Sequence, residues 1–199
     1  MMSIRRGRDQ PQRARTLADQ EADTLARRAA RGDSDAFAEL CRGVQHDVWR
    51  YCWSLTGDRD LTDDATQETF LRATTAIARF RGDAPVRVWF VVLARRSVGA
   101  VLERHKRTPV PAEPVSIPVR DGTGYVDLAA LIKDLPPDAR QAFVLTQMLG
   151  FSYADAAAAM DCPVGTIRSR VFRAKATLVD AWDATHATEP VAHNEEVCE

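Results

Sequence analysis

The stretch PVGTIRSRVFRAKATL, residues 163 to 178, decides how this chain folds and what it contacts. On a helix of about 100° per residue, its apolar side chains form one stripe, made of Ile167, Val171, Ala174 and Leu178. This stripe predicts the buried face. The opposite face carries Gly165, Ser169, Phe172, Arg173 and Ala176, with Arg168 and Arg170 flanking it. An aromatic side chain so far from the buried stripe indicates a face that contacts another molecule.

The segment just before this helix predicts a second, shorter helix. SYADAAAAM (152–160) begins with Ser152 as an N-cap and Asp155 three residues later, a variant of the capping box. Its alanines permit a close helix crossing, and the turn MDCP joins it to the next helix. These are helix-turn-helix proportions, in which arginine and serine of the second helix read base edges in the major groove. The spacing alone leaves open a helical hairpin with a solvated basic face and a buried Phe172.

Composition indicates a soluble globular protein whose charge is segregated along the chain. Of 199 residues 45% are hydrophobic and 28% charged, and the net charge is −1. Residues 1–16 hold five arginines against one acid, whereas residues 183–199 hold five acids and no lysine or arginine. Such tails have too little apolar surface to offset their ordering entropy, so we expect disorder over 1–19 and 183–199. The local charge of the folded middle therefore matters more than the net charge.

Nothing in the sequence predicts a metal site, a cofactor or a catalytic residue. The four cysteines form no C-x-x-C pair and no metal-like spacing with histidine, and no phosphate-binding, nucleophile-elbow or zinc-protease motif is present. We therefore expect a protein that is not an enzyme. No signal peptide appears, and no run reaches the roughly 18 apolar residues of a membrane span. These features predict a cytoplasmic protein with reduced thiols and no membrane insertion.

The chain divides into two helical lobes. Four prolines between Pro109 and Pro118 exclude a helix there, and we expect a linker over 106–124. Apolar periodicity before it predicts three helices: one from the N-cap candidate Ser34, one over 60–78 and one from Val86 to about His105. After it, the pattern predicts helices over 126–135 and over 138–149, the latter ended by Gly150, ahead of the two already described. The predicted fold is all-α, with domains over 20–105 and 125–182.

Three stretches of the sequence carry a family resemblance. DDATQETFLRA (63–73) and ARFRGDAPVRVWFVVLARR (78–96) resemble region 2 of extracytoplasmic-function (group 4) sigma factors, within the sigma-70 family. LPPDARQAFVLTQMLGFSYADAAAAMDCPVGTIRSRVFRAKATL (135–178) closely resembles their region 4. The match spans about residues 24–180. It implies a region 2 helical bundle and a region 4 helix-turn-helix. It also implies an alternative sigma factor that binds core RNA polymerase, recognises the −35 element with region 4, and recognises and melts the −10 element with region 2.

The first region 2 stretch predicts a protein-docking helix. One side of this helix groups acids, an amide and a leucine, which is an apolar centre with a polar rim. The resemblance implies that this helix docks on the clamp helices of the polymerase β′ subunit, and that the chain also contacts the β flap. The contact candidates are Asp64, Gln67, Glu68 and Leu71. A solvated acidic face is the alternative for the helix taken alone.

The second region 2 stretch concerns the −10 element. The resemblance implies that the loop RFRGDAP (79–85) captures a base flipped out of the melted DNA, with Phe80 lining the pocket and Arg79 and Arg81 holding phosphates. Phe80 as a simple core anchor of the loop is compatible with this role. The next helix carries two adjacent arginines, Arg95 and Arg96. It departs from the family pattern, because Arg96 stands where relatives often carry an asparagine. Two adjacent arginines suit phosphate contacts.

In region 4 the resemblance implies that Arg168, Ser169, Phe172 and Arg173 read the −35 element, with Thr166 and Arg170 on phosphates. Three of the four readers, Ser169, Phe172 and Arg173, lie on the outward face obtained from the helical wheel. An anti-sigma partner is common in the family, although no residue of this chain indicates one. Two other functions fit the pattern less closely. One is a helix-turn-helix regulator with an N-terminal sensing lobe, acting outside the polymerase, and the other is a helical adaptor that binds only proteins.

Overall fold

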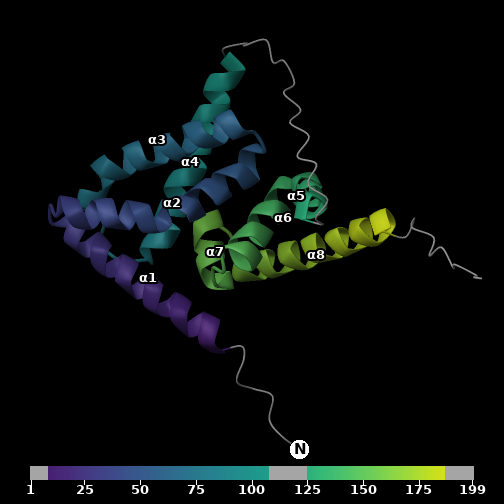
Figure 1. The fold of residues 1–199 in the computed structure, drawn as a ribbon, viewed down its shortest axis with the longest axis horizontal. Coiled ribbons are helices and arrows are strands. Elements are labelled where there is room, and N and C mark those ends of the chain that lie inside the picture. Colours follow the sequence, from purple (N-terminus) through teal and green to yellow (C-terminus); the bar gives the residue numbers. More distant parts are fainter. Residues whose placement is uncertain (1–8, 108–124, 187–199) are drawn as a thin grey trace, which may run out of the picture.

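The computed structural model describes residues 9–107 and 125–186, and these ranges contain helices and no strand (Figure 1). The N-terminal half consists of α1 (Asp9–Ala30), α2 (Ser34–Thr56), α3 (Arg59–Ala76), a 3-10 turn (Ile77–Arg79) and α4 (Val86–Arg107). The C-terminal half consists of α5 (Tyr125–Asp134), α6 (Pro137–Phe143), a π-helical turn (Val144–Met148), α7 (Tyr153–Met160) and α8 (Val164–His186). The all-α prediction is confirmed.

Three boundaries differ from the sequence-based expectation. Helix α1 begins at Asp9, so residues 9–19 of the expected disordered extension are helical. Arginine, alanine, leucine and glutamine dominate this segment, and all four favour helix over other conformations. Helix α4 continues to Arg107, into the expected linker, and α8 continues to His186, into the expected acidic tail. The remaining parts of the two tails and the linker, residues 1–8, 108–124 and 187–199, lie outside the described residues.

At the starts of α2 and α7, a hydrogen bond identifies the side chain that caps the helix. The expected N-cap of α2 was Ser34, but the cap is Asp33, whose carboxylate accepts a hydrogen bond of 2.9 Å from the N–H of Ala36. Ser34 is the first helical residue instead. Helix α7 is capped as predicted, because Ser152 Oγ accepts from the N–H of Asp155 at 3.0 Å. Gly150, the predicted stop, has a φ of 64°, where the absence of a Cβ removes the strain.

Helices α2, α3 and α4 enclose the core of the N-terminal half. Tyr51 and Leu40 of α2 are fully buried, and Phe90 of α4 stands against Phe70 of α3 with ring centroids 5.7 Å apart. Burying side chains of this size contributes about 1.5–3 kcal/mol each. The apolar periodicity that predicted this helix therefore reflects its core face.

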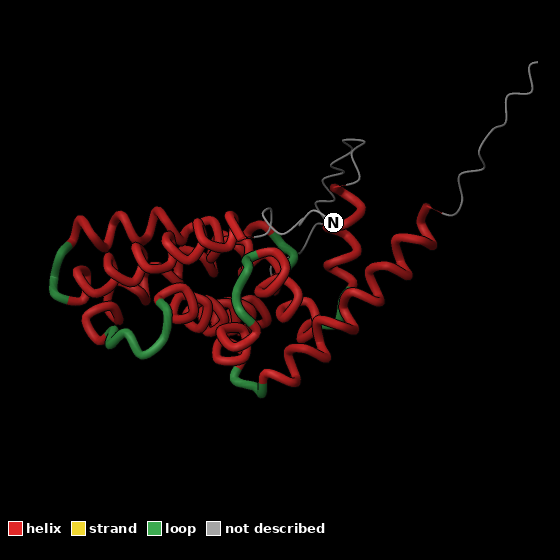
Figure 2. Tube along the Cα trace, turned by 90° about the horizontal axis from the view of Figure 1, so that it is seen from below, coloured by secondary structure: helices red, strands yellow, loops and turns green. Residues whose placement is uncertain are grey.

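The C-terminal half packs against this bundle. Helix α7 lies on α4, and α6 lies on α2, where the Tyr51 hydroxyl donates to Gln141 Oε1 at 3.3 Å. Figures 1 and 2 both show α8 extending away from the other helices toward its C-terminal end. One long helix is therefore presented outward, held to the rest of the molecule by its N-terminal part.

Candidate functional site

Helix α8 buries the predicted stripe. Ile167 is 0% exposed, Val171 2%, Ala174 1% and Leu178 8%. The helix starts directly after Pro163, whose carbonyl accepts hydrogen bonds from the N–H groups of Thr166 and Ile167. Proline is tolerated at this position because an N–H ahead of the first helical turn would have no intrahelical partner to lose. The buried stripe therefore determines which side chains of α8 face outward.

The outward face of α8 is open to solvent around one aromatic side chain. Phe172 is 74% exposed, and Arg168, Ser169 and Arg173 are exposed around it. Among the described residues, neither Arg168 nor Arg173 forms an ion pair; Arg173 Nε donates only to the Ser169 carbonyl, at 3.4 Å. We call these four residues the reading face. Two guanidinium groups without an ion pair, beside an exposed aromatic ring, can bind phosphates and contact a base or its methyl group.

The two predicted phosphate contacts of region 4, Thr166 and Arg170, are less exposed than the reading face. The Arg170 guanidinium donates to the Asp138 carboxylate of α6 and, at 3.6 Å, to Cys162 Sγ, and only 19% of its side chain is exposed. Thr166 is half-buried, and its carbonyl accepts from Ser169 Oγ at 2.9 Å. Arg170 therefore fixes α8 against α6, and the reading face depends on it indirectly.

The turn between α7 and α8 gives the pair its helix-turn-helix geometry. Asp161 takes the left-handed conformation with a φ of 52°, and its N–H bonds to the last carbonyls of α7. Aspartate tolerates this conformation better than most residues. Ala156, Ala157 and Ala159 are buried where α7 packs against neighbouring helices. Small side chains allow this close crossing. Because Phe172 is 74% exposed, the hairpin alternative with a buried Phe172 is wrong.

The outer side of α3 carries another exposed apolar side chain. Leu71 is 57% exposed, Asp64 and Gln67 are exposed, and Glu68 pairs with Arg72 at 2.7 Å. Beside them a groove of 460 Å³ runs between α2 and α3. Phe37 and Trp49 of α2 and Phe70 of α3 line the groove together with Gln67 and Leu71.

This groove adds residues that the sequence analysis did not single out. Phe37, Cys41, Gln45 and Trp49 succeed one another at intervals of four on α2 and line the groove together. That spacing was the available signal. Trp49 is held in place by stacking on Trp53, with centroids 5.6 Å apart, and by donating to Asp63 Oδ1 at 2.8 Å. We call Gln67, Leu71, Phe37, Trp49 and Phe70 the α2–α3 groove.

The loop after α3 is fixed by aromatic packing. The Phe80 ring meets Trp89 edge-on, with centroids 5.7 Å apart, so Phe80 is half-buried. Arg79 and Arg81 on either side are exposed. Gly82 has a φ of 79°, which a residue with a Cβ rarely adopts. Phe80 is therefore an anchor of the loop, and two cations stand next to it.

The two arginines of α4 lie at the junction of the halves. Arg95 and Arg96 are exposed and line a cleft of 490 Å³ together with Ala158, Ala159 and Asp161 at the C-terminal end of α7. Helix α7 thus stands beside the side of α4 that the sequence assigned to −10 DNA. No residue of the reading face lines this cleft.

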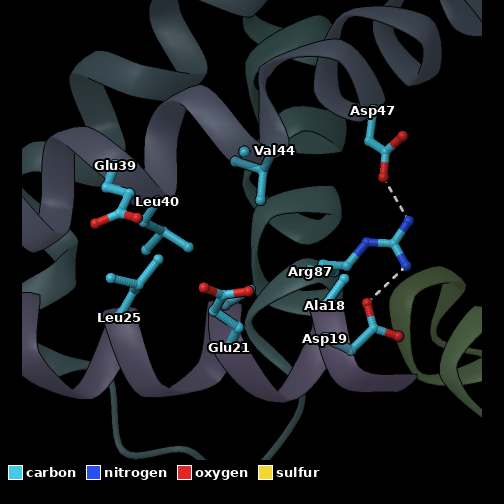
Figure 3. A pocket seen from close by; sticks show the side chains of 11 residues that line it. Ala18, Asp19, Glu21, Leu25, Glu39, Leu40, Val44, Asp47 and Arg87 are labelled. Carbon is cyan, nitrogen blue, oxygen red and sulfur yellow. Dashed lines mark hydrogen bonds and ion pairs between the residues drawn. The ribbon is translucent and has the colours of Figure 1, made fainter. Parts of the chain in front are cut away.

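Arg87 of α4 joins the halves, and no sequence signal marked it. Its guanidinium pairs with Asp19 of α1 at 2.9 Å and with Asp47 of α2, as Figure 3 shows, and donates to the Leu149 carbonyl at 3.0 Å. It also lies 4.8 Å from the centre of the Phe151 ring. Both Leu149 and Phe151 belong to the C-terminal half. Four elements distant in sequence therefore meet at one cation.

The described residues contain no cluster of three or more histidine, cysteine or acidic side chains placed to bind a metal. None of their helices combines the length and hydropathy of a membrane span. Burial raises the pKa of Cys52 and of Cys41 to about 11, so both thiols stay protonated near neutral pH.

Comparisons with known proteins agree with both lobes. Residues 40–108 match the family model described as sigma-70 region 2, and residues 125–178 match sigma-70 region 4. The chain is 45% identical to the ECF RNA polymerase sigma factor SigC of Mycobacterium tuberculosis, over 83% of this chain and 95% of that protein. It is 31% identical to the ECF RNA polymerase sigma-E factor of Escherichia coli, over 76% and 88%.

A solved structure has a similar fold. It is the sigma factor RpoE of Bartonella quintana in complex with the anti-sigma factor NepR. Its TM-score is 0.61 at 25% identity, and the match covers 74% of this chain and 96% of that one. In this chain sigma-70 region 2 precedes sigma-70 region 4. The chain belongs to the sigma-70 family, as an ECF RNA polymerase sigma factor.

Proposed function

We propose that this sigma factor uses the reading face of α8 on the −35 element, the Phe80 loop and Arg95–Arg96 on the −10 element, and the outer side of α3 on core polymerase. The protein acts by joining core polymerase and promoter DNA in one complex in the cytoplasm. This role needs no catalytic residue. Contacts to the β′ clamp helices through Asp64, Gln67, Glu68 and Leu71, and to the β flap, belong to the same proposal, as does control by an anti-sigma partner.

The observation that carries the DNA part is Phe172, 74% exposed between Arg168 and Arg173 on the second helix of a helix-turn-helix. Leaving a phenylalanine in water forgoes about 1.5–3 kcal/mol of burial. The buried stripe of α8 shows that the helix orientation is fixed, so Phe172 does not reach the core by a small rotation. Contact with the thymine methyl and phosphates of a major groove accounts for both the ring and its charges.

The two DNA sites lie too close together here to act at once. Centres at −35 and −10 are about 25 base pairs apart, which is roughly 85 Å along B-DNA. In the structure α7, the neighbour of α8 in the helix-turn-helix, shares a cleft with Arg95 and Arg96. Binding both elements therefore requires the contact of α7 with α4 to open, and core polymerase holds the two halves apart.

Run-off transcription tests this function. Core polymerase is incubated with genomic fragments, with and without the purified protein, and transcripts are mapped. New start sites that depend on the protein, with common sequences near −35 and −10, are the expected result. Failure of core polymerase to retain the protein in a pull-down contradicts the proposal. Tight binding to palindromic duplexes without polymerase, and no new transcripts, identifies a regulator of the helix-turn-helix type instead.

A further inference from the structure

The reading face has no partner within the described residues, although it is the most exposed apolar and cationic surface of α8. Phe172 is the most exposed of the large apolar side chains in the described ranges. Lys175, one turn beyond Phe172, is also exposed and forms no ion pair there. A free sigma factor thus carries an exposed ring with three cations around it, a surface that binds polyanions of any sequence at low salt.

The chain carries a complementary segment directly after α8. Residues 187–199 contain four glutamates and no lysine or arginine. The last six residues, NEEVCE (194–199), place Val197 between Glu195 and Glu196 on one side and Glu199 on the other. An apolar side chain flanked by anions matches an exposed phenylalanine flanked by cations. Residues 194–199 and the reading face are therefore complementary, since each has an apolar side chain flanked by charges and the two sets of charges have opposite sign.

The length of this segment suffices to reach the reading face. From His186 back to Arg173 is thirteen residues of helix, about 20 Å, and back to Arg168 about 27 Å. Glu195 follows His186 by nine residues, which span about 30 Å when extended, and Glu199 reaches about 43 Å. The acidic residues farthest from α8 in sequence are those that reach its N-terminal half.

We propose that residues 194–199 fold back along α8 and bind the reading face, with Val197 against Phe172 and the glutamates beside Arg168, Arg173 and Lys175. The proposal rests on the function proposed for this face, because it makes the segment a competitor of −35 DNA. A tethered partner has an effective concentration in the millimolar range, so even a weak contact is populated. DNA affinity then falls by the fraction of molecules whose face is occupied.

Zero-length carbodiimide crosslinking of the full chain tests the contact directly. The chain has three lysines, Lys106, Lys133 and Lys175, and this small number makes the crosslinks easy to assign. We expect crosslinks from Lys175 to Glu195, Glu196 or Glu199, which disappear at high salt. Lys106 and Lys133 serve as internal controls. Crosslinks of the three glutamates that are no more frequent at Lys175 than at Lys106 or Lys133 overturn the proposal.

Duplex binding tests the competition. The variant E195Q/E196Q/E199Q and a chain ending at His186 are titrated with a fluorescent DNA duplex of mixed sequence, and then with a duplex carrying a −35 sequence found by run-off transcription. We expect both to bind about three- to tenfold more tightly than the full chain at low salt, with a smaller ratio at high salt. The matched control E21Q/E39Q/D60N changes the charge by the same amount at exposed positions of α1, α2 and α3, and should bind as the full chain does.

The outcomes separate this inference from the function on which it rests. Equal affinity of the full chain, the triple glutamine variant and the shortened chain, with transcription intact, overturns the inference and leaves the function standing. An equal gain in the control variant shows a general charge effect and also overturns it. Absence of duplex binding in all chains, together with absence of transcripts, contradicts the proposed function itself.

Discussion

Leu71 on α3 and Phe172 on α8 are the same physical feature in two different settings. Each is a large apolar side chain in the middle of an exposed helix face, 57% and 74% exposed. Around Leu71 stand Asp64, Gln67 and Glu68, whereas around Phe172 stand arginines. The apolar centre gives binding energy in both, but the charge around it selects the partner. An acidic rim repels phosphates, so the α3 face suits a protein and the α8 face suits DNA.

The largest effect is expected from Leu71→Glu. A carboxylate at the apolar centre of the α3 face should weaken binding to core polymerase about 30-fold, equivalent to about 2 kcal/mol, because it must be desolvated in the interface. Duplex binding by α8 should be unchanged. Fluorescence titration of labelled protein with core polymerase measures the loss, and circular dichroism checks that the helices persist.

Val179→Glu is the matched control for this experiment. Val179 is also 57% exposed but lies on α8, away from the α3 face. If Val179→Glu weakens polymerase binding as much as Leu71→Glu does, the α3 face is not the selective contact. If Leu71→Glu also lowers duplex affinity, the two faces are not independent and the comparison fails.

A smaller effect is expected from Phe172→Ala. Removing the ring should lower affinity for a −35 duplex about tenfold, because the contact with the thymine methyl is lost while the phosphate contacts of the arginines remain. The salt dependence of binding should therefore stay the same. Val179→Ala, on the same helix, should bind DNA normally. A tenfold loss in polymerase binding by Phe172→Ala would show that the ring contacts protein instead.

The outward face of α8 was predicted well because the helical wheel and the resemblance to sigma region 4 agreed on most of its residues. The stripe containing Ile167 and Val171 fixes the buried face, and so places Phe172 outward without any knowledge of the neighbours. Ser152 was identified as a cap because its hydroxyl acts within its own helix turn. In both cases the deciding interaction lies within four residues in the sequence.

Interactions between distant segments were not predictable in this way. Arg87 pairs with Asp19 and Asp47, 68 and 40 residues away, and periodicity carries no information about such pairs. Arg170 was assigned to phosphate because it lies beside the reading face, and nothing in the sequence indicated that its guanidinium group also pairs with Asp138, 32 residues earlier. The start of α1 was missed because disorder over residues 9–19 was predicted from their charge and low apolar content, whereas their helix propensity favours a helix. Periodicity thus does not predict which partner a charged side chain such as Arg87 meets in the folded protein.

The smallest effects are expected from Arg168→Gln and Arg170→Gln. Comparing these two variants tests, on α8 itself, an arginine without an ion pair against an arginine that is paired within the protein. Arg168 is exposed and free of ion pairs among the described residues, so its loss should lower duplex affinity about fivefold and reduce the salt slope by about one. Arg170 is 19% exposed and bound to Asp138, so its loss should lower the free energy of unfolding by about 0.5 kcal/mol and change the salt slope little.

Asp138→Asn distinguishes the two roles of Arg170. It removes the acceptor charge on α6 and leaves the arginine in place, so it should reproduce the loss of stability seen with Arg170→Gln. If Arg170 contacts phosphate after all, Asp138→Asn frees the guanidinium and raises duplex affinity, while Arg170→Gln lowers it with a full unit of salt slope. Urea unfolding and duplex titrations at several salt concentrations give both quantities. Opposite shifts in affinity would place Arg170 on the DNA side of α8, and parallel losses of stability with unchanged DNA binding place it between α8 and α6.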